Sequence, residues 1–426
     1  MTIREQAARM KLDSPKMAAT DITVRNAALE KIAEALLTNK ESIFEANEKD
    51  MERARAEEIS PAVIKRLKFS ETKLTDAVAG IHNLIELPDP LFQIQLKRQL
   101  DEGLTLVRET CPIGVIGVIF EARPDAMVQI ASLCIKSGNC AILKGGSETR
   151  ETNKVLFSLI YEAALSSGLP EGCLFQAQMR DEIAELLACH ESVDLLIPRG
   201  SNAFVQYIMN NTKIPVLGHA DGICHIYVDK DFDLEKAIPV IIDAKTQYTA
   251  ACNAVETLLV HKDALDRLMP PLQKAFQEYK ISLRATQDIA DKYGSDVATE
   301  EDFATEYLDL IISAKAVDNI DEAVWHINRY GSHHTDCIIT EDIKAAEYFM
   351  RMVDSAGVYQ NCSTRFADGF RYGFGAEVGI STGKIHARGP VGLEGLVTYK
   401  YKLFGSGQIV GDYAEGRKSF HFKELQ

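Results

Sequence analysis

The sequence has no cysteine pair at C-x-x-C spacing, and its nine cysteines are scattered and odd in number. Zinc knuckles and disulfide frameworks use regular cysteine spacings, so this pattern is typical of a reducing compartment. No apolar run approaches the roughly 20 residues that a membrane-spanning helix needs. The charged first residues do not form an apolar signal segment. We therefore expect a cytoplasmic protein that does not enter a membrane.

The common nucleotide-binding motifs are also missing. Residues 114–117 and 373–375 do not have the spacing of the G-x-G-x-x-G dinucleotide fingerprint. The stretch 144–148 is not a P-loop, because the Gly-Lys-Ser/Thr ending is absent. Any nucleotide binding is therefore of neither ordinary type.

Metal-ligand patterns are equally sparse. Cys189-His190 and His333-His334 are pairs of potential ligands, but no second pair at ligand spacing accompanies either of them. We predict no metal site and place both pairs in surface loops.

The composition describes a globular protein with an acidic balance. Hydrophobic residues make up 46% and charged residues 26% of the 426 positions, and the net charge is -15. This charge argues against nucleic-acid binding, and an anionic ligand would need a local basic patch. A chain of this length is too long for one ordinary core, so we expect two or three domains.

Strands and helices alternate after a helical start of about ninety residues. A hairpin with Asp101-Glu102-Gly103 as its turn is predicted over 100–108, either as an association arm or as an ordinary edge hairpin. The first alternating series has strands over 115–120, 141–144, 174–177, 193–197, 215–218 and 223–228, and helices over 125–137, 148–166, 182–188 and 201–209. The second has helices over 234–245, 264–278, 320–327 and 343–353, and strands over 257–260, 281–285, 308–313, 336–340 and 357–360. This alternation predicts an α/β fold with two domains and parallel-rich sheets covered by helices.

Unusual residues cluster where the first series of strands ends, and ligands of parallel sheets bind at such ends. They are Glu121, Arg123, Lys144, Gly145, Gly146, Ser147, Arg199, Gly200, Ser201 and Gly218. Glycines admit a ligand close to the backbone, a helix N-terminus favours anions, and Lys144 can reach a phosphate or a ribose hydroxyl. The alternatives are a plain turn with Ser147 as helix cap, and a solvated Arg199.

One thiol lies in a segment of small residues between a predicted helix and a predicted buried strand. The segment 247–256 contains Cys252, and its small neighbours leave the sulfur approachable, which suits a nucleophile. A buried, inert cysteine is the alternative, because free cysteine is among the most buried residue types.

Taken together, these stretches resemble the aldehyde dehydrogenase superfamily and, within it, the branch of reductases that act on L-glutamyl 5-phosphate in proline biosynthesis. The carriers are PIGVIGVIFEARPD (112–125), KGGSE (144–148), LLIPRGS (195–201), VLGHADG (216–222), TAACN (249–253), TEYL (305–308) and YGFGAEVGIST (372–382). The resemblance covers nearly the whole chain. It implies an aldehyde dehydrogenase-like fold of two α/β domains with a β-hairpin oligomerisation arm.

The resemblance also implies residue roles. Cys252 would be the nucleophile, with Asn253 and Arg123 beside it in catalysis. Lys144 would hold the adenosine ribose and Glu306 the nicotinamide ribose of NADPH, with Lys144 and Arg150 as partners of its 2′-phosphate. The remaining expected cofactor contacts are Gly145, Ser147, Glu148, Arg199, Gly200 and Ser201. The candidates for the substrate's phosphate and carboxylate are Arg123, Arg365, Lys384, His386 and Arg388, of which the last four have a structural role as the alternative.

Two departures from ordinary aldehyde dehydrogenases bear on the chemistry. The glutamate that activates the deacylating water is absent from 217–222, as a phosphate-exchanging reductase requires, although Asp221 remains an alternative base. The oxyanion-binding asparagine falls near Ala122-Arg123, so Arg123 is a candidate either to replace it or to hold the substrate's phosphate.

The implied reaction is NADPH-dependent reduction of L-glutamyl 5-phosphate to L-glutamate 5-semialdehyde and phosphate through a Cys252 thioester. A separate glutamate 5-kinase would supply the substrate. A CoA-acylating or other acyl-phosphate reductase, and a scaffold protein without activity, are the alternatives. The expected domains are 1–98 with 112–230 for NADP(H), 99–111 with 391–426 for homo-oligomerisation, and 231–390 for catalysis.

Overall fold

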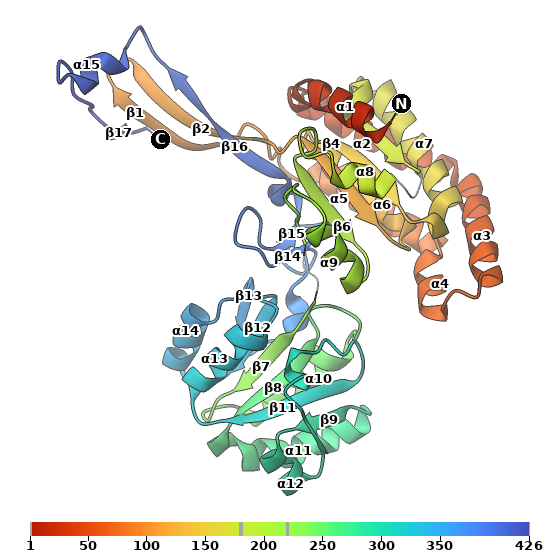
Figure 1. Cartoon of the computed structure of the whole chain (residues 1–426), viewed down its shortest axis with the longest axis vertical. Coiled ribbons are helices and arrows are strands. Elements are labelled where there is room, and N and C mark those ends of the chain that lie inside the picture. The colour runs from red at the N-terminus through yellow and green to blue at the C-terminus, as the bar shows by residue number, and fades with distance from the viewer. Residues whose placement is uncertain (1, 179–181, 219–220, 426) are drawn as a thin grey trace. The chain divides into compact units, whose positions relative to one another are not determined.

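The computed structural model describes residues 2–178, 182–218 and 221–425, and it divides into two compact units (Figure 1). The first unit comprises Met1–Leu217, Phe374–Gly379 and Val391–Gln426, and the second comprises Gly218–Gly373 and Ile380–Pro390. The main division therefore comes at Leu217, thirteen residues before the expected boundary at 230. Among the described residues, no helix combines the length and the apolar character needed to cross a membrane.

A four-stranded parallel sheet forms the centre of the first unit, with strand order β5-β4-β3-β6. Its strands are β3 (Val115–Phe120), β4 (Cys140–Gly145), β5 (Leu174–Ala177) and β6 (Leu195–Arg199). The helices of this unit are α1 (Ile3–Ala18), α2 (Ile22–Thr38), α3 (Lys40–Ala56), α4 (Pro61–Leu67), α5 (Glu71–Glu86), α6 (Pro124–Lys136), α7 (Arg150–Ser166), α8 (Glu182–Leu187), α9 (Asn202–Asn210) and α15 (Val410–Ala414). Every residue of β3 is buried, as expected of a parallel strand covered on both faces.

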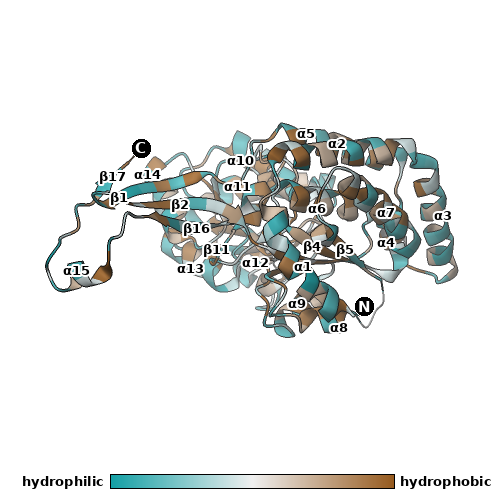
Figure 2. Cartoon of the chain, turned by 90° about the horizontal axis from the view of Figure 1, so that it is seen from above, coloured by the Kyte–Doolittle hydropathy of each residue, from teal (hydrophilic) through white to brown (hydrophobic). Residues whose placement is uncertain are grey.

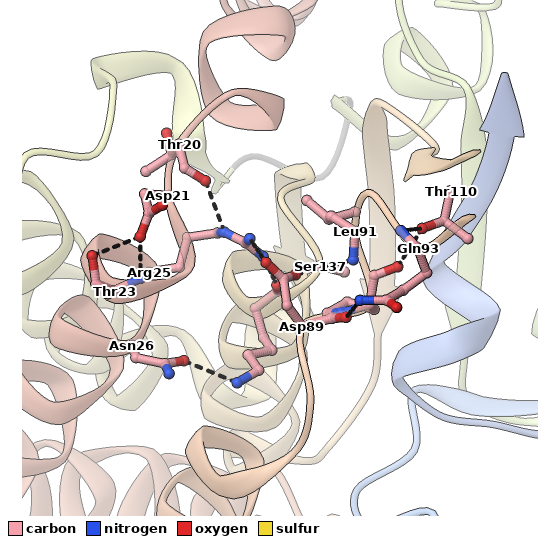
Figure 3. A network of polar contacts seen from close by, with 12 residues as sticks. Thr20, Asp21, Thr23, Arg25, Asn26, Asp89, Leu91, Gln93, Thr110 and Ser137 are labelled. Carbon is pink, nitrogen blue, oxygen red and sulfur yellow. Dashed lines mark hydrogen bonds and ion pairs between the residues drawn. The ribbon is translucent and has the colours of Figure 1, made fainter. Parts of the chain in front are cut away.

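A buried arginine ties α2 to α6 and to the linker that precedes β1 (Figure 3). The Arg25 side chain has no solvent exposure, and it donates to the Lys136 carbonyl and to Asp89 Oδ2, the latter at 2.7 Å. Lys136 Nζ in turn donates to Asn26 Oδ1 at 2.9 Å, and burial lowers the pKa of this lysine to about 8. The network fixes the root of the antiparallel sheet that follows, because Asp89 Oδ1 accepts the N–H of Leu91 at 3.0 Å.

The predicted hairpin is present in an antiparallel sheet of order β16-β2-β1-β17. Its strands are β1 (Ile94–Asp101), β2 (Leu104–Pro112), β16 (Val397–Phe404) and β17 (Lys423–Glu424). Gly103 adopts φ +69° in the turn between β1 and β2, a conformation that glycine takes without strain. β16 exposes apolar side chains, and brown segments mark the ribbon of this sheet in Figure 2. Its role in association stays a prediction.

The second unit is built on a seven-stranded parallel sheet of order β10-β9-β11-β8-β7-β12-β13. Its strands are β7 (Cys224–Val228), β8 (Val255–His261), β9 (Ser282–Ala285), β10 (Asp296–Val297), β11 (Ile311–Val317), β12 (Thr335–Ile339) and β13 (Gly357–Gln360). Its helices are α10 (Leu234–Thr246), α11 (Leu265–Glu278), α12 (Gln287–Tyr293), α13 (Ile320–Tyr330) and α14 (Ile343–Met352). One core cluster joins the sheet to α10 and α11, and another joins it to α13 and α14. β7, which the sequence grouped with the cofactor domain, lies inside this sheet. Two short strands, β14 (Gly379–Ser381) and β15 (Gly389–Val391), pair separately.

Some predicted elements are wrong at their boundaries for local reasons. The strand expected over 215–218 is reduced to a single bridge between Val216 and Leu196. The strand expected over 308–313 begins instead at Ile311, because Leu308 has φ +56° and cannot continue an extended backbone. A 3-10 helix, Ser147–Thr149, precedes α7, so Ser147 is not the helix cap.

Candidate active site

The segment around Cys252 joins the end of α10 to the start of β8 in the second unit. Two tight turns shape it: Ala251 N–H donates to the Tyr248 carbonyl at 3.2 Å, and Ala254 N–H donates to the Ala251 carbonyl at 2.9 Å. Cys252 is partly exposed, whereas six of the nine cysteines are buried. The sequence therefore folds here into the predicted small-residue turn, and its cysteine is partly exposed.

The backbone just before β7 packs closely against this turn. A Cβ on Gly222 would lie 2.0 Å from the Cys252 carbonyl oxygen, a separation that real Cβ atoms do not show. Cys224 Sγ donates to the same carbonyl at 3.4 Å. Only glycine at position 222 therefore permits the observed packing of the thiol segment. In the motif 217–222, His219 and Ala220 lie outside the described residues.

A histidine that no sequence motif indicated contacts the thiol. His334 Nε2 lies 3.2 Å from Cys252 Sγ, and His334 is only 1% exposed. The assignment of His333-His334 to a surface loop is therefore wrong for His334. No spacing in the sequence reveals the contact, because 82 residues separate the two side chains. They meet because β8 and β12 both flank β7, so the residues before these strands lie at the same edge of the sheet.

A buried carboxylate holds the two strands beneath the thiol. Asp336 Oδ1 accepts the backbone N–H of His225 at 2.7 Å and lies 3.0 Å from His225 Nδ1. Both side chains are fully buried. This pairing of His225 with Asp336 fixes β7 against β12. It thereby positions Cys224 and Thr335, which precede His225 and Asp336 in the sequence.

A second buried pair closes the thiol segment at its two ends. Lys245, in the last turn of α10, places Nζ 2.5 Å from Glu256 Oε2 in β8, and both side chains have no exposure. Burial raises the pKa of the Glu256 carboxyl to about 7, against the opposing effect of Lys245. Burial also lowers the pKa of Lys245. Glu306, an expected cofactor contact, lies near enough to raise the pKa of Glu256 further.

The side chain of Asn253, the residue after Cys252, is buried. Its Nδ2 donates to the Ala367 carbonyl at 2.8 Å, and the backbone carbonyl of Asn253 accepts the Thr364 hydroxyl at 2.7 Å. These bonds hold the 3-10 helix Thr364–Phe366, which contains Arg365. Arg365 Nε donates to Gln247 Oε1 at 2.9 Å. Burial lowers the pKa of Arg365, whereas the charge of Cys252 acts to raise it, so this predicted substrate residue lies near the thiol.

The remaining basic candidates of the second unit have a different partner. Lys384 Nζ lies 2.6 Å from Asp354 Oδ2, and Arg388 donates to the Asp354 carbonyl at 3.0 Å. Lys384 holds the pKa of Asp354 below its usual range. His386 lies exposed in the same loop with φ +68°. The structure therefore brings Lys384 and Arg388 to Asp354.

The strand ends of the first unit bring the predicted cofactor residues together. Glu148 Oε1 accepts the N–H of Ala122 at 2.5 Å, which links the turn after β4 to the turn after β3. Glu121 Oε2 accepts the N–H of Ser201 at 3.0 Å, and Glu121 N–H donates to the Arg199 carbonyl at 2.9 Å. The cluster contains Lys144, Gly145, Ser147, Glu148, Arg199, Gly200 and Ser201, and Arg123 is exposed at the start of α6.

The donors of this cluster fit a dinucleotide. The Ser201 N–H, before the start of α9, donates to the Glu121 carboxylate. This helix start therefore binds an anionic oxygen, of the kind that a pyrophosphate would supply. Lys144 is 4% exposed, burial lowers its pKa, and one of its three donors binds the Gly145 carbonyl at 2.7 Å. The other two can bind ribose hydroxyls. Arg150, the second candidate for a 2′-phosphate, is paired with Glu151 at 3.0 Å and remains largely exposed.

Comparison with known proteins gives the chain clear relatives. The model of the aldehyde dehydrogenase family matches residues 2–307. Gamma-glutamyl phosphate reductase of Acetivibrio thermocellus is 52% identical over 425 residues, which cover 100% of this chain and 99% of that protein. Gamma-glutamyl phosphate reductase 1 of Synechocystis sp. is 55% identical over 94% of this chain and 93% of its own.

Solved structures agree with these relatives. The crystal structure of gamma-glutamyl phosphate reductase from Thermotoga maritima matches with a TM-score of 0.93 and 38% identity, covering 95% of this chain and 99% of that one. An acetylating aldehyde dehydrogenase from Geobacillus thermoglucosidasius matches with a TM-score of 0.64 and 17% identity, over 95% and 97% of the two chains. An engineered glycolyl-CoA reductase with bound NADP+ matches at 15% identity and a TM-score of 0.65, over 94% and 96%. The last two show the shared fold alone.

Proposed function

The chain belongs to the aldehyde dehydrogenase family and, within it, to the gamma-glutamyl phosphate reductases, and on this premise we propose that it reduces L-glutamyl 5-phosphate to L-glutamate 5-semialdehyde and phosphate. The observation that carries the proposal is the full-length identity of 52% to a relative of that name, joined to a partly exposed Cys252 in the predicted turn. The partly exposed thiol supports nucleophilic catalysis, because a thiol buried among apolar groups would be inert.

In the proposed reaction, Cys252 Sγ attacks the acyl carbon of the substrate. The bond from that carbon to the phosphate oxygen breaks, and the acyl group remains on Cys252 as a thioester. A bound nicotinamide cofactor supplies the hydride that reduces this carbon. The resulting thiohemiacetal collapses to the aldehyde and frees the thiolate of Cys252.

We propose that the strand-end cluster of the first unit holds the cofactor, and Glu306 keeps its expected role as a contact of the nicotinamide ribose. NADPH is the proposed cofactor, with Lys144 and Arg150 as partners of its 2′-phosphate. The buried position of Lys144 supports its role, because a partly desolvated ammonium binds an anion or a hydroxyl more strongly than an exposed one.

Two arginines are the preferred partners of the substrate's anionic groups. Arg365 lies near the thiol, and Arg123 lies exposed at the start of α6. Lys384 and Arg388 both form ion pairs with Asp354, which favours their structural alternative. His386 stays a candidate on the same loop.

The exposed apolar strand β16 supports self-association through the antiparallel sheet. Tyr399, Tyr401, Leu403 and Phe404 are each about half exposed, at 49%, 57%, 58% and 58%. An exposed apolar edge of this kind is protected when a second copy covers it. A separate glutamate 5-kinase would supply the substrate, and a reducing cytoplasm would preserve the nine free cysteines.

The reverse reaction tests the proposal. NADPH formation from glutamate 5-semialdehyde and NADP+ is measured with and without inorganic phosphate. The measurement is then repeated with CoA in place of phosphate. Strict dependence on phosphate is expected. Equal turnover without phosphate would mean that water resolves the thioester, and dependence on CoA would mean a CoA-acylating enzyme.

A further inference from the structure

The thiol of Cys252 has a nitrogen base in direct contact. The separation of 3.2 Å between Cys252 Sγ and His334 Nε2 is a hydrogen-bonding distance for sulfur. His334 is almost fully buried, so solvent does not compete for its ring. A nucleophile and a base within hydrogen-bond reach are the usual arrangement for activating a thiol.

The imidazole of His334 is held in one orientation. Its Nδ1 lies 2.9 Å from the hydroxyl oxygen of Thr335, and the N–H of Gly357 donates to the His334 carbonyl at 3.0 Å. When Nδ1–H donates to Thr335, the proton-free Nε2 is the atom that faces Cys252 Sγ. Thr335 therefore acts as the third group that orients the base.

The charged and titratable groups near Cys252 and His334 favour an ion pair of thiolate and imidazolium. Arg365, from the 3-10 helix Thr364–Phe366, interacts electrostatically with Cys252. Cys224, from β7, is neutral because burial raises its pKa well above the ordinary value. Asp336, in β12, is satisfied by His225 and by the Ser355 hydroxyl. Arg365 thus brings a permanent positive charge to the sulfur, and this charge favours the thiolate.

We propose that His334 is the acid–base residue of the thiol site: Nε2 takes the proton of Cys252 as the sulfur attacks, and returns it to the departing phosphate. The inference rests on the proposed function, because it needs Cys252 as the nucleophile.

The protons balance over one turnover. The S–H bond of Cys252 breaks and an N–H bond forms at His334, while the new C–S bond displaces phosphate. The imidazolium then protonates the leaving phosphate, which departs as hydrogen phosphate and leaves His334 neutral. After the thioester carbon has accepted the hydride, collapse of the thiohemiacetal releases a thiolate. The partly exposed Cys252 thiolate then takes up one proton from solvent, which accounts for the single proton that the reaction consumes.

The test compares His334→Gln with the matched control His190→Gln, an exposed histidine of the first unit. Turnover and the rate of Cys252 alkylation by iodoacetamide are measured, the latter by mass spectrometry of the Cys252 peptide between pH 5 and 10. For His334→Gln we expect turnover to fall about 100- to 10,000-fold. Alkylation at pH 7 should slow at least about tenfold and recover at pH 10, where the thiol ionises without help.

The orienting role of Thr335 has its own variant. Thr335→Val removes the partner of Nδ1 and should shift the pH profile of alkylation in the same direction by a smaller amount, with KM little changed. If His334→Gln does not fold, the pH profile of Cys252 alkylation in the wild-type protein decides. A single inflection at the ordinary thiol pKa of about 8.5 would overturn the proposal, and an inflection well below it is expected.

The outcomes separate the two claims. Near-normal turnover of Cys252→Ser would overturn the proposed function as well as this inference. Loss of turnover in Cys252→Ser, with alkylation and turnover of His334→Gln within about threefold of wild type, would overturn the role of His334 alone.

Discussion

Breaking the buried ion pair between Lys245 and Glu256 should destabilise the second unit. The pair has no solvent exposure and a separation of 2.5 Å, and it clamps both ends of the segment that contains Cys252. Removing one partner leaves an uncompensated buried group, which costs about 3–5 kcal/mol. We therefore expect Lys245→Met and Glu256→Leu each to lower the free energy of unfolding of this unit by about 3 kcal/mol.

The pair also predicts a pH dependence of stability. Burial raises the pKa of Glu256 from 4.5 to about 7, so the folded state binds this proton more tightly than the unfolded state. The corresponding stability is fully present below about pH 4.5 and is lost as the pH rises to 7, by roughly 3 kcal/mol. Lys245, whose pKa burial lowers, contributes stability at alkaline pH that is lost as the pH falls. Glu256→Gln should remove the slope between pH 4.5 and 7.

Tryptophan fluorescence follows this unit selectively, because the only tryptophan of the chain, Trp325, lies in α13. Urea unfolding of the wild type, the two single variants and Lys245→Met/Glu256→Leu gives the four free energies. The double variant should lose much less than the sum of the single ones, because two apolar side chains leave no buried charge. Losses below about 1 kcal/mol in both single variants, or additivity in the double variant, would refute the reasoning.

Three further predictions concern other contacts. Gly222→Ala should lower kcat about 100-fold or more in the reverse assay, because its Cβ would meet the Cys252 carbonyl at 2.0 Å; unchanged kcat would contradict the close packing. Arg25→Met should destabilise the first unit by about 3–5 kcal/mol in calorimetry, because it leaves Asp89 without its buried partner; a melting temperature equal to that of wild type would count against this network. Lys144→Ala should weaken NADPH binding about tenfold in a fluorescence titration at an unchanged melting temperature of the first unit, and an unaltered Kd would remove Lys144 from the cofactor site.

Much of the fold follows from local sequence. The continuous apolar stretch 115–120 forms a buried parallel strand, and the Gly103 turn joins a hairpin, because each depends on neighbouring residues alone. The start of β11 could not be predicted, because nothing about a leucine indicates that Leu308 adopts a left-handed backbone conformation. The position of β7 also did not follow, because sheet membership depends on long-range pairing.

The candidate site divides in the same way. The turn of Cys252 could be predicted, because small residues between a helix and a buried strand shape it locally. His334 could not, because only the strand order β8-β7-β12 brings it to the thiol. Lys384 and Arg388 were chosen for charge alone, and the structure pairs them with Asp354, a partner that composition cannot reveal.

The central claim is that the reaction passes through a thioester on Cys252. A rapid-mixing experiment with glutamate 5-semialdehyde and NADP+ in the absence of phosphate tests it most directly. The account predicts a burst of one NADPH per chain that then stops, resumes when phosphate is added, and is absent from Cys252→Ala. Continued NADPH formation without phosphate, or a full burst in Cys252→Ala, would contradict it.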